Sequence, residues 1–180
     1  AQKTVHATSP SHARLFYALW PDASTRDALA ALQAPVRGRK VTPANLHLTL
    51  AFLGSQPRAS LPLLESLLDK LPEPRFALAI DSYGYFSKAR IAWAGPSAMP
   101  DPLLWMYNAL VNALDEAKVA CKASAGFRPH VTLARDAERV DQQSAPVPAV
   151  AWSVMTVALV ESVPVQGGVH YQLLATRTLA

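Results

Sequence analysis

The sequence predicts an α+β fold made of two similar lobes. Strand-like and helical stretches follow one another as strand, helix, strand, helix and strands, and then as helix, strand and strands. The pattern His-x-Thr-Leu-Ala occurs twice, at residues 47–51 and 130–134, once in each half. A chain of 180 residues can bury a sizeable core, so we expect residues 14–180 to form a single two-lobed domain.

The first elements are predicted from apolar patterning and from helix start and stop signals. Residues 1–13 are polar, and we interpret them as a flexible leader. Residues 14–20 form a β-rich, mostly apolar run that is typical of a buried strand. A helix follows, capped by Asp22 or Ser24, and Pro35 ends it.

The rest of the first half is predicted to contain one more helix and several strands. A basic loop at residues 36–43 leads into the first motif strand, residues 45–54. Residues 58–71 carry leucines at helical spacing and are predicted to form a helix. Residues 75–81 alternate as a strand does. Two shorter stretches are expected to form a bent or paired strand: residues 83–86 and 90–94.

The second half begins with a helix whose cap is Asp101, with Pro102 at its first position. Its apolar stripe comprises Leu103, Tyr107, Leu110 and Leu114. A short loop leads into the second motif strand, and residues 136–148 are polar and expected to be a loop. Residues 150–160 and 169–176 are predicted strands, joined by a turn at the glycines that follow Gln166.

The positive charge of the chain is concentrated near the two motifs. A net charge of +4 and a pI near 9.4 are by themselves ordinary for a soluble protein. The cations that precede or flank the motifs are Arg37, Arg39, Lys40, Arg128 and Arg135. Cations beside both motif strands favour an anionic substrate such as a phosphate or a nucleic acid.

Composition excludes several classes of protein. The single cysteine, Cys121, excludes an internal disulfide framework and fits a reducing compartment. The N-terminal residues contain no apolar stretch of the kind found in secretory signals, and no apolar run reaches membrane-spanning length. We therefore expect a cytoplasmic protein that does not associate with membranes.

The two motifs supply the groups needed for acid–base cleavage of a phosphate ester. Strand alternation places His47 and Thr49 on one face, and His130 and Thr132 likewise. A neutral imidazole accepts a proton and an imidazolium donates one near neutral pH. The hydroxyls can donate hydrogen bonds to phosphate oxygens. The sequence contains no metal-binding or nucleotide triphosphate motif, so we expect no metal and no cofactor.

A single His-x-Thr on a strand is weak support for catalysis, because most strand histidines are structural. Two extended copies among only five histidines favour catalysis strongly. A non-catalytic RNA-binding module that keeps the groove as a scaffold is the alternative from another functional class. Intact copies of both motifs argue against it, since a binding module could lose either histidine.

Four stretches also match a known family in order and spacing. These are residues 14–19, 45–54, 127–135 and 171–174. The chain resembles the two-histidine phosphoesterase superfamily, specifically the RNA 2′,3′-cyclic phosphodiesterases once called 2′-5′ RNA ligases. The resemblance implies a bilobal, pseudo-two-fold fold with two antiparallel sheets lining a central groove and helices outside. His47 and His130 would face one another across that groove.

The resemblance also implies a reaction. A terminal 2′,3′-cyclic phosphate of RNA would be hydrolysed to a 2′-phosphate without a metal, with reversible 2′-5′ ligation as a side activity. His130 would act as the base that activates water and His47 as the acid. The partner would be RNA with such an end, tRNA fragments included, and a monomer without an obligate protein partner is expected. Cyclic nucleotide-sugar phosphates and 2′-5′ oligonucleotides are the alternative substrates.

Four further residues are expected to bind the substrate. Phe52 and Arg135 end the motif strands and could stack on a base from either side. Strict alternation places both on the leucine face, so the strand ends would have to bend into the groove. Arg128 and Tyr171 complete the set. Relatives often carry a basic residue before the last tyrosine, and this chain departs from them there: His170 either replaces that residue or is a surface histidine, in which case an RNA contact is missing. The four tryptophans are expected in the core: Trp20, Trp93, Trp105 and Trp152.

Overall fold

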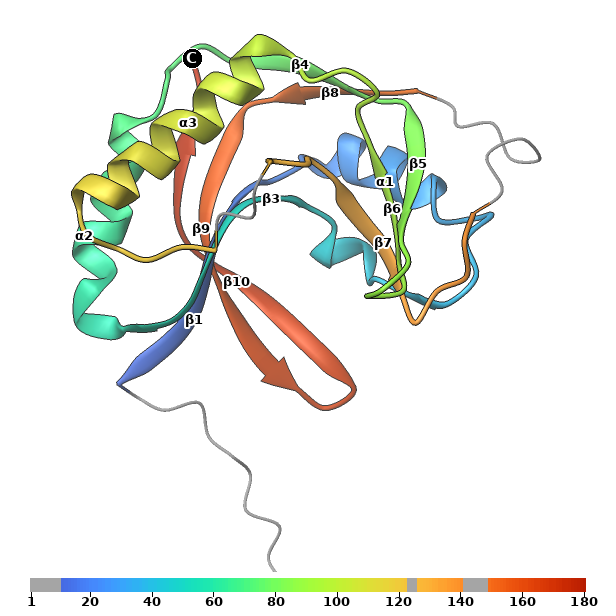
Figure 1. Ribbon diagram of the computed structural model, residues 1–180, viewed down its shortest axis with the longest axis horizontal. Coiled ribbons are helices and arrows are strands. Elements are labelled where there is room, and N and C mark those ends of the chain that lie inside the picture. Colours follow the sequence, from blue (N-terminus) through green and yellow to red (C-terminus); the bar gives the residue numbers. More distant parts are fainter. Residues whose placement is uncertain (1–10, 123–125, 141–148) are drawn as a thin grey trace, which may run out of the picture.

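The structure, a computed structural model, describes residues 11–122, 126–140 and 149–180 (Figure 1). Its strands are β1 (His12–Leu19), β2 (Arg39–Lys40), β3 (Leu48–Pro57), β4 (Phe76–Ile80), β5 (Ser82–Phe86), β6 (Ile91–Gly95), β7 (Val131–Arg135), β8 (Val150–Val154), β9 (Thr156–Val165) and β10 (Gly168–Thr178). Its α-helices are α1 (Ala23–Ala31), α2 (Leu61–Ser66) and α3 (Asp101–Glu116), and its 3₁₀ helices are η1 (Pro43–Asn45), η2 (Arg58–Ser60) and η3 (Leu67–Lys70). The predicted α+β class with two antiparallel sheets is confirmed.

The larger sheet spans both halves of the molecule. Its strand order is β10-β9-β1-β3-β7-β6-β5, with β2 beside β7, and the smaller sheet pairs β4 with β8. The two halves meet between β3 and β7, where Leu48 lies opposite Val131. Each of these residues directly follows a motif histidine. This junction therefore brings together His47 and His130, which are 83 positions apart in the chain.

Helices α2 and α3 lie along the outer side of the half that contains β1, β9 and β10 (Figure 1). The hydroxyl of Tyr17 on β1 donates to the carbonyl of Leu64 on α2 at 2.5 Å. Arg177 on β10 donates to the carbonyls of Leu68 and Leu71, at 2.6 and 2.7 Å, at the end of η3. These hydrogen bonds fix the helical layer against β1 and β10.

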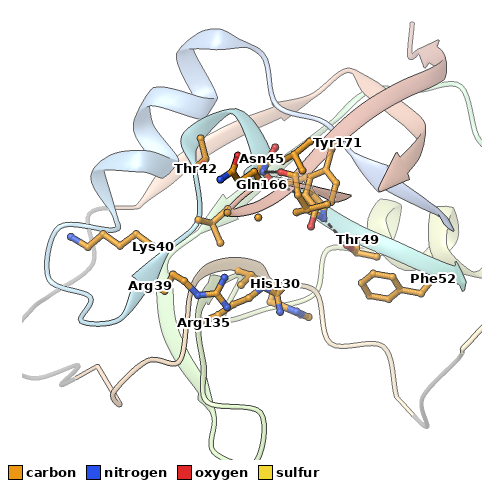
Figure 2. Close-up of a pocket in the computed structure, with 17 residues that line it drawn as sticks. Arg39, Lys40, Thr42, Asn45, Thr49, Phe52, His130, Arg135, Gln166 and Tyr171 are labelled. Carbon is orange, nitrogen blue, oxygen red and sulfur yellow. Dashed lines mark hydrogen bonds between the residues drawn. The ribbon is translucent and has the colours of Figure 1, made fainter. Parts of the chain in front are cut away.

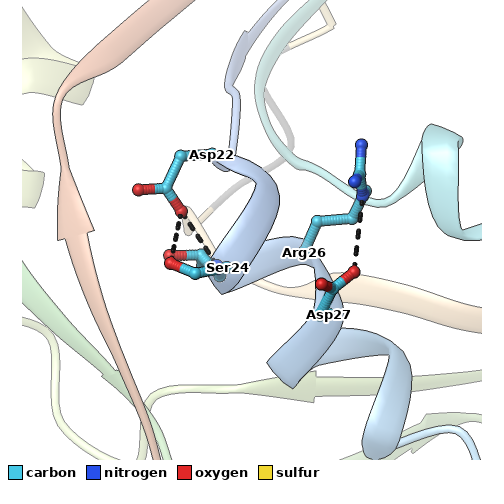
Figure 3. Close-up of polar contacts among 5 residues, drawn as sticks. Asp22, Ser24, Arg26 and Asp27 are labelled. Atoms are coloured by element: carbon cyan, nitrogen blue, oxygen red, sulfur yellow. Dashed lines mark hydrogen bonds and ion pairs between the residues drawn. The ribbon is translucent and has the colours of Figure 1, made fainter.

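Helix α1 is fixed to the other half of the sheet. Asp22 caps it, since its carboxylate accepts from the backbone N–H of Thr25 at 2.8 Å (Figure 3). At the other end, Gln33 donates to the carbonyls of Leu133 on β7 and Val41. The hydroxyl of Tyr83 on β5 donates to the carbonyl of Leu32. Asp22, one of the two predicted caps, is therefore the cap that the structure uses.

The main core contains buried residues from both sheets and all three α-helices. A second, smaller cluster lies on the other face of β1 and β9 and contains Phe16, Ala18, Ala158 and Val160. Trp20 and Tyr171 pack against it. Because alternate residues of β1 point to opposite faces, Tyr17 enters the main core while Phe16 supports the opposite surface, on which the first motif lies.

Several predicted boundaries were wrong. The predicted strand 150–160 is two strands, because the chain leaves the small sheet at Met155 and joins β1 in the large one. The predicted helix 58–71 is the succession η2, α2 and η3. β1 begins at His12, within the predicted leader, whose residues 1–10 lie outside the described residues. The cap of α3 is Pro100, with Asp101 in the first turn.

Other expectations were confirmed. Residues 83–86 and 90–94 lie in the paired strands β5 and β6. The β9–β10 turn contains Gly167 with φ +83°, a conformation that glycine adopts without strain. Residues 141–148 of the predicted loop lie outside the described residues. Within the described part of the chain, no helix combines the length and the apolar character needed to span a membrane.

Candidate active site

A pocket of about 310 Å³ lies where the two halves of the large sheet meet (Figure 2). Seven of the eight predicted site residues line it: His47, Thr49, Phe52, His130, Thr132, Arg135 and Tyr171. The strand β2, the loop before the first motif and the β9–β10 turn complete its walls. The pocket is therefore built from both motifs, as the family resemblance implied.

His47 is held by hydrogen bonds at both ring nitrogens. It lies between η1 and the first residue of β3, one position before the strand. Its Nδ1 is 2.7 Å from the carbonyl oxygen of Asn45, and its Nε2 is 2.9 Å from the hydroxyl of Thr49. A carbonyl only accepts, so Nδ1 carries the proton. Nε2 is therefore the nitrogen available to exchange a proton in the pocket.

Three aromatic rings enclose the imidazole of His47. Trp20 stacks on it with centroids 5.4 Å apart, and Phe16 lies 5.0 Å away. Tyr171 meets it edge-on at 5.2 Å. Removal of water by this enclosure lowers the pKa of His47 from 6.5 to about 4, despite the hydrogen bond to the Asn45 carbonyl. The free protein therefore holds His47 neutral at pH 7.

His130 repeats this arrangement in the second half. Its Nδ1 is 2.8 Å from the carbonyl oxygen of Arg128, again two residues earlier in the chain. Phe86 lies edge-on to its ring at 5.0 Å, and Trp93 lies at 5.9 Å. Burial lowers the pKa of His130, and the nearby Arg128 and Arg135 lower it further. In both histidines a carbonyl thus occupies Nδ1, which leaves Nε2 as the nitrogen that can exchange a proton.

A β-bulge in β3 places Phe52 in the pocket. Between Thr49 and Ala51, β3 has one residue more than the facing stretch of β1, and Leu50 is the extra residue. An extra residue shifts the alternation by one, so Phe52 returns to the face of Thr49. Phe52 is 51% exposed. Strict alternation required the end of the strand to bend for Phe52 to reach the groove, and the bulge within the motif provides that change of direction.

The second motif contains the equivalent irregularity. Two consecutive residues of β6 face three residues of β7, and Leu133 is the extra one. Arg135 is thereby on the same face as Thr132 and lines the pocket. It lies opposite Arg39 of β2, which forms an exposed ion pair with Asp136 at 3.3 Å. Lys40 also lines this wall, which makes that side of the pocket cationic.

A second pocket, of about 370 Å³, adjoins the first. The two pockets share Thr49, Phe52 and His130. The exposed side chain of Arg128 lines the second pocket and lies 6.0 Å from the ring of Phe86. Arg128, the eighth predicted site residue, therefore lines the second pocket and not the first, although its charge acts on His130. His170 is exposed on β10 and lines neither pocket.

Sequence reasoning missed the residues that surround the histidines. Of the four tryptophans assigned to the core, only Trp152 is fully buried, while Trp105 is 60% exposed. Trp20 and Trp93 instead contact the two histidines. The backbone carbonyls that bind Nδ1 could have been found from the sequence, because each belongs to the residue two positions before its histidine. The stacking of Trp20 had none, since it depends on strand pairing.

Comparisons with known proteins place the chain among the phosphoesterases. The family model described as LigT like Phosphoesterase matches residues 19–93. An RNA 2′,3′-cyclic phosphodiesterase of Escherichia coli is 34% identical over 145 residues, covering 78% of this chain and 80% of that protein. One of Thermus thermophilus is 34% identical over 170 residues, covering 83% of this chain and 81% of that protein.

Solved structures extend the similarity to the whole fold. The crystal structure of E. coli LigT in apo form matches with a TM-score of 0.80 and 28% identity, covering 94% of this chain and 98% of that chain. The same protein complexed with 3′-AMP matches with a TM-score of 0.80, 29% identity and the same coverage. The similarity in fold thus extends over nearly the whole chain. The chain belongs to the LigT-like phosphoesterase family, as its sequence predicted.

Proposed function

We propose that the protein hydrolyses the terminal 2′,3′-cyclic phosphate of RNA to a 2′-phosphate. The observation that carries this proposal is the pair of imidazoles at one pocket, each with Nδ1 hydrogen-bonded to a carbonyl, so that Nε2 is the nitrogen that can exchange a proton. The cationic wall formed by Arg39, Lys40 and Arg135 suits a phosphate. The names of the relatives and the 3′-AMP complex of LigT support RNA as the substrate.

The proposed step is an in-line displacement at phosphorus. His130 accepts a proton from water through Nε2 while the water oxygen bonds to phosphorus. The bond from phosphorus to O3′ breaks, and His47 donates the proton on its Nε2 to that oxygen. Each proton transfer contributes about 10²–10⁴-fold in rate. The products are a 2′-phosphate and a free 3′-hydroxyl.

The hydrogen bond that the Thr49 hydroxyl donates depends on the protonation state of His47. In the free protein His47 is neutral, so the hydroxyl of Thr49 donates to its Nε2. Once His47 is protonated, Nε2 becomes a donor and the hydroxyl of Thr49 is free to donate to a phosphate oxygen. Thr132 lines the pocket at the equivalent position of the second motif. We assign both hydroxyls to the non-bridging oxygens, where charge develops in the transition state.

The division of roles rests on where the two pockets lie. His130 lines both pockets, so water can approach it from the second pocket, whereas His47 lines only the first. His130 is therefore the proposed base and His47 the acid. The lowered pKa of His47 opposes protonation in the free protein, and the charge of a bound phosphodiester anion raises that pKa. Substrate binding thus favours the protonated form of His47, which is the form that can act as the acid.

The substrate base is proposed to lie between Phe52 and Arg135, which the two bulges bring to the same pocket. Tyr171 closes the pocket beside His47. RNA ends, including those of tRNA fragments, are the proposed partners of a cytoplasmic monomer that needs no protein partner and no metal. Reversible 2′-5′ ligation uses the same groups.

The test is turnover, in EDTA, of a short RNA that ends in a 2′,3′-cyclic phosphate, with the product isomer identified. A 2′-phosphate is expected, and His47→Ala and His130→Ala should each lower kcat by about 10²–10⁴-fold. A 3′-phosphate would contradict the assigned leaving oxygen. Absence of turnover, or full activity of either variant, would contradict the proposed function.

A substrate with sulfur in place of O3′ separates the two roles, because a thiolate leaves without the help of an acid. With this substrate His47→Ala should recover most of the activity of the unaltered protein, and His130→Ala should not. The opposite recovery would exchange the roles of the two histidines.

A further inference from the structure

The second pocket differs from the first in its chemistry. Tyr107 of α3 and Phe127, in the segment before the second motif, stack with centroids 4.1 Å apart and 3° between their planes. Phe52 and Phe86 also line this pocket, and its two cations are Lys122 and Arg128. Aromatic faces combined with cations are typical of surfaces that bind single-stranded nucleic acid. The pocket is thus suited to a base and its neighbouring phosphates.

The position of Lys122 is fixed by the sheet. Its backbone N–H donates to the carbonyl oxygen of Phe52 at 3.1 Å, and the two residues form a β-bridge. The exposed side chain of Lys122 therefore starts from a defined point beside the motif strand. On the opposite side, Arg128 precedes His130 by two residues, and the carbonyl of Arg128 supports the imidazole. Both cations of the pocket are thereby tied to the catalytic strands.

We propose that the second pocket is an acceptor subsite, which holds a nucleoside whose free 5′-hydroxyl attacks the cyclic phosphate in place of water. This inference rests on the proposed function. The nucleoside base lies against the aromatic wall of Tyr107 and Phe127, and Lys122 contacts the next phosphate of the acceptor strand. The pocket therefore determines how much ligation accompanies hydrolysis.

The geometry of displacement at phosphorus selects this occupant. The attacking oxygen must lie opposite the leaving O3′, and the two pockets meet at Thr49 and His130. His47, the proposed acid, lines only the first pocket, so O3′ faces that side. The attacking group then enters from the second pocket, beside the proposed base His130. The preceding nucleotide of the donor RNA is joined to O5′ of the terminal ribose, away from the cyclic phosphate, so it need not occupy the space beside His130.

The step balances in both directions. His130 takes the proton of the 5′-hydroxyl, the 5′-oxygen bonds to phosphorus, the bond from phosphorus to O3′ breaks, and His47 gives its proton to O3′. The product is a 2′-5′ phosphodiester with a free 3′-hydroxyl. The reverse step attacks with that 3′-hydroxyl, expels the acceptor and regenerates the cyclic phosphate. Cleavage of a 2′-5′ linked dinucleotide therefore needs the same subsite.

The experiment compares two reactions of the same protein variants. One is hydrolysis of a nucleoside 2′,3′-cyclic phosphate, and the other is ligation of an RNA with a cyclic phosphate end to a triribonucleotide with a 5′-hydroxyl. Tyr107→Ala should lower the ratio of ligation to hydrolysis by about tenfold, since a base–aromatic stack is lost. Lys122→Ala should lower the same ratio and weaken its dependence on salt. Trp105→Ala is the matched control, because Trp105 is an exposed aromatic residue of α3 that lines neither pocket.

The outcomes separate this inference from the proposed function. If Tyr107→Ala and Lys122→Ala keep the ratio of the unaltered protein, or lower both reactions equally, the acceptor subsite is refuted. The same holds if the unaltered protein hydrolyses the cyclic phosphate but neither ligates the triribonucleotide nor cleaves a 2′-5′ dinucleotide. If the cyclic phosphate is not hydrolysed at all, the proposed function itself fails.

Discussion

The indole of Trp20 lies parallel to the imidazole of His47, with ring centroids 5.4 Å apart and 8° between the planes. Trp20 directly follows β1, and His47 directly precedes β3. Leu19 and Leu48 form the last pair of the antiparallel β1–β3 ladder. Because the two strands run in opposite directions, the residue after Leu19 and the residue before Leu48 are the next to face one another. The strand register thus places an apolar ring over the proposed acid.

This stacking predicts that Trp20→Leu raises the pKa of His47. The smaller side chain admits water, and relief of desolvation moves the pKa from about 4 toward its ordinary value of 6.5. Titration of the imidazole protons by NMR in the free protein measures the change. Trp105→Leu should leave the titration unaltered, since Trp105 is exposed and lines neither pocket. A pKa that stays near 4 in Trp20→Leu would show that the indole does not exclude the water.

The lowered pKa of His47 also predicts a loss of stability in mild acid. Between about pH 6.5 and pH 4 His47 is protonated in the unfolded chain and neutral in the folded protein. The free energy of unfolding therefore falls as the pH falls. The slope for this one group is at most about 1.4 kcal/mol per pH unit. His130, whose pKa is also lowered, adds to the fall in the same direction.

Urea unfolding at a series of pH values measures this dependence. His47→Gln removes one titrating imidazole, so its free energy of unfolding should fall less steeply between pH 6.5 and pH 4. Above pH 6.5 the two proteins should show parallel dependences. Equal slopes below pH 6.5 would mean that His47 protonates as readily in the folded protein as in the unfolded chain.

The bulge that exposes Phe52 predicts a role in substrate binding. Phe52→Ala removes the aromatic face for a base and should raise KM for an RNA with a cyclic phosphate end by about tenfold. The proton transfers do not involve this ring, so kcat should change much less. Leu63→Ala is a suitable control, since Leu63 is 46% exposed on α2 and lines neither pocket. A fall in kcat with constant KM would assign Phe52 to the chemistry instead.

Gly84 makes room for the ring that supports His130. It lies opposite Trp93 in the β5–β6 pairing, and a Cβ added there would be 2.0 Å from Cζ2 of that indole. Gly84→Ala should therefore displace Trp93, lower the stability by about 1–3 kcal/mol and reduce kcat. Gly168→Ala is the control for stability alone, because nothing lies within 4 Å of an added Cβ at that position although the residue lines the first pocket. Unchanged unfolding and kcat in Gly84→Ala would show that the indole is not needed where it lies.

Much of this protein follows from its sequence alone. The motif spacing predicted that His47 and Thr49 share a face, and the 2.9 Å contact between them confirms it. The repeated motif was specific enough to suggest the family, and the resemblance to that family implied that both histidines face one groove. These inferences succeed because they depend on residues two apart in a strand or on a pattern that is specific in itself.

Other features depended on pairings between distant strands. The extra residues Leu50 and Leu133 appear only when β3 is aligned with β1 and β7 with β6, and they turn Phe52 and Arg135 into the pocket. The split of residues 150–160 depends in the same way on two different partner strands.

The tertiary structure alone also decided the surroundings of the histidines. Trp20 is apolar and follows a buried strand, so local pattern placed it in the core, whereas the register of β1 on β3 placed it on His47. Tyr107 has the spacing of a core residue on α3, but the path of the chain before β7 stacks Phe127 on it at the edge of the second pocket. Sequence periodicity specifies which face of an element a residue occupies, but contacts between elements distant in the chain specify what that face meets.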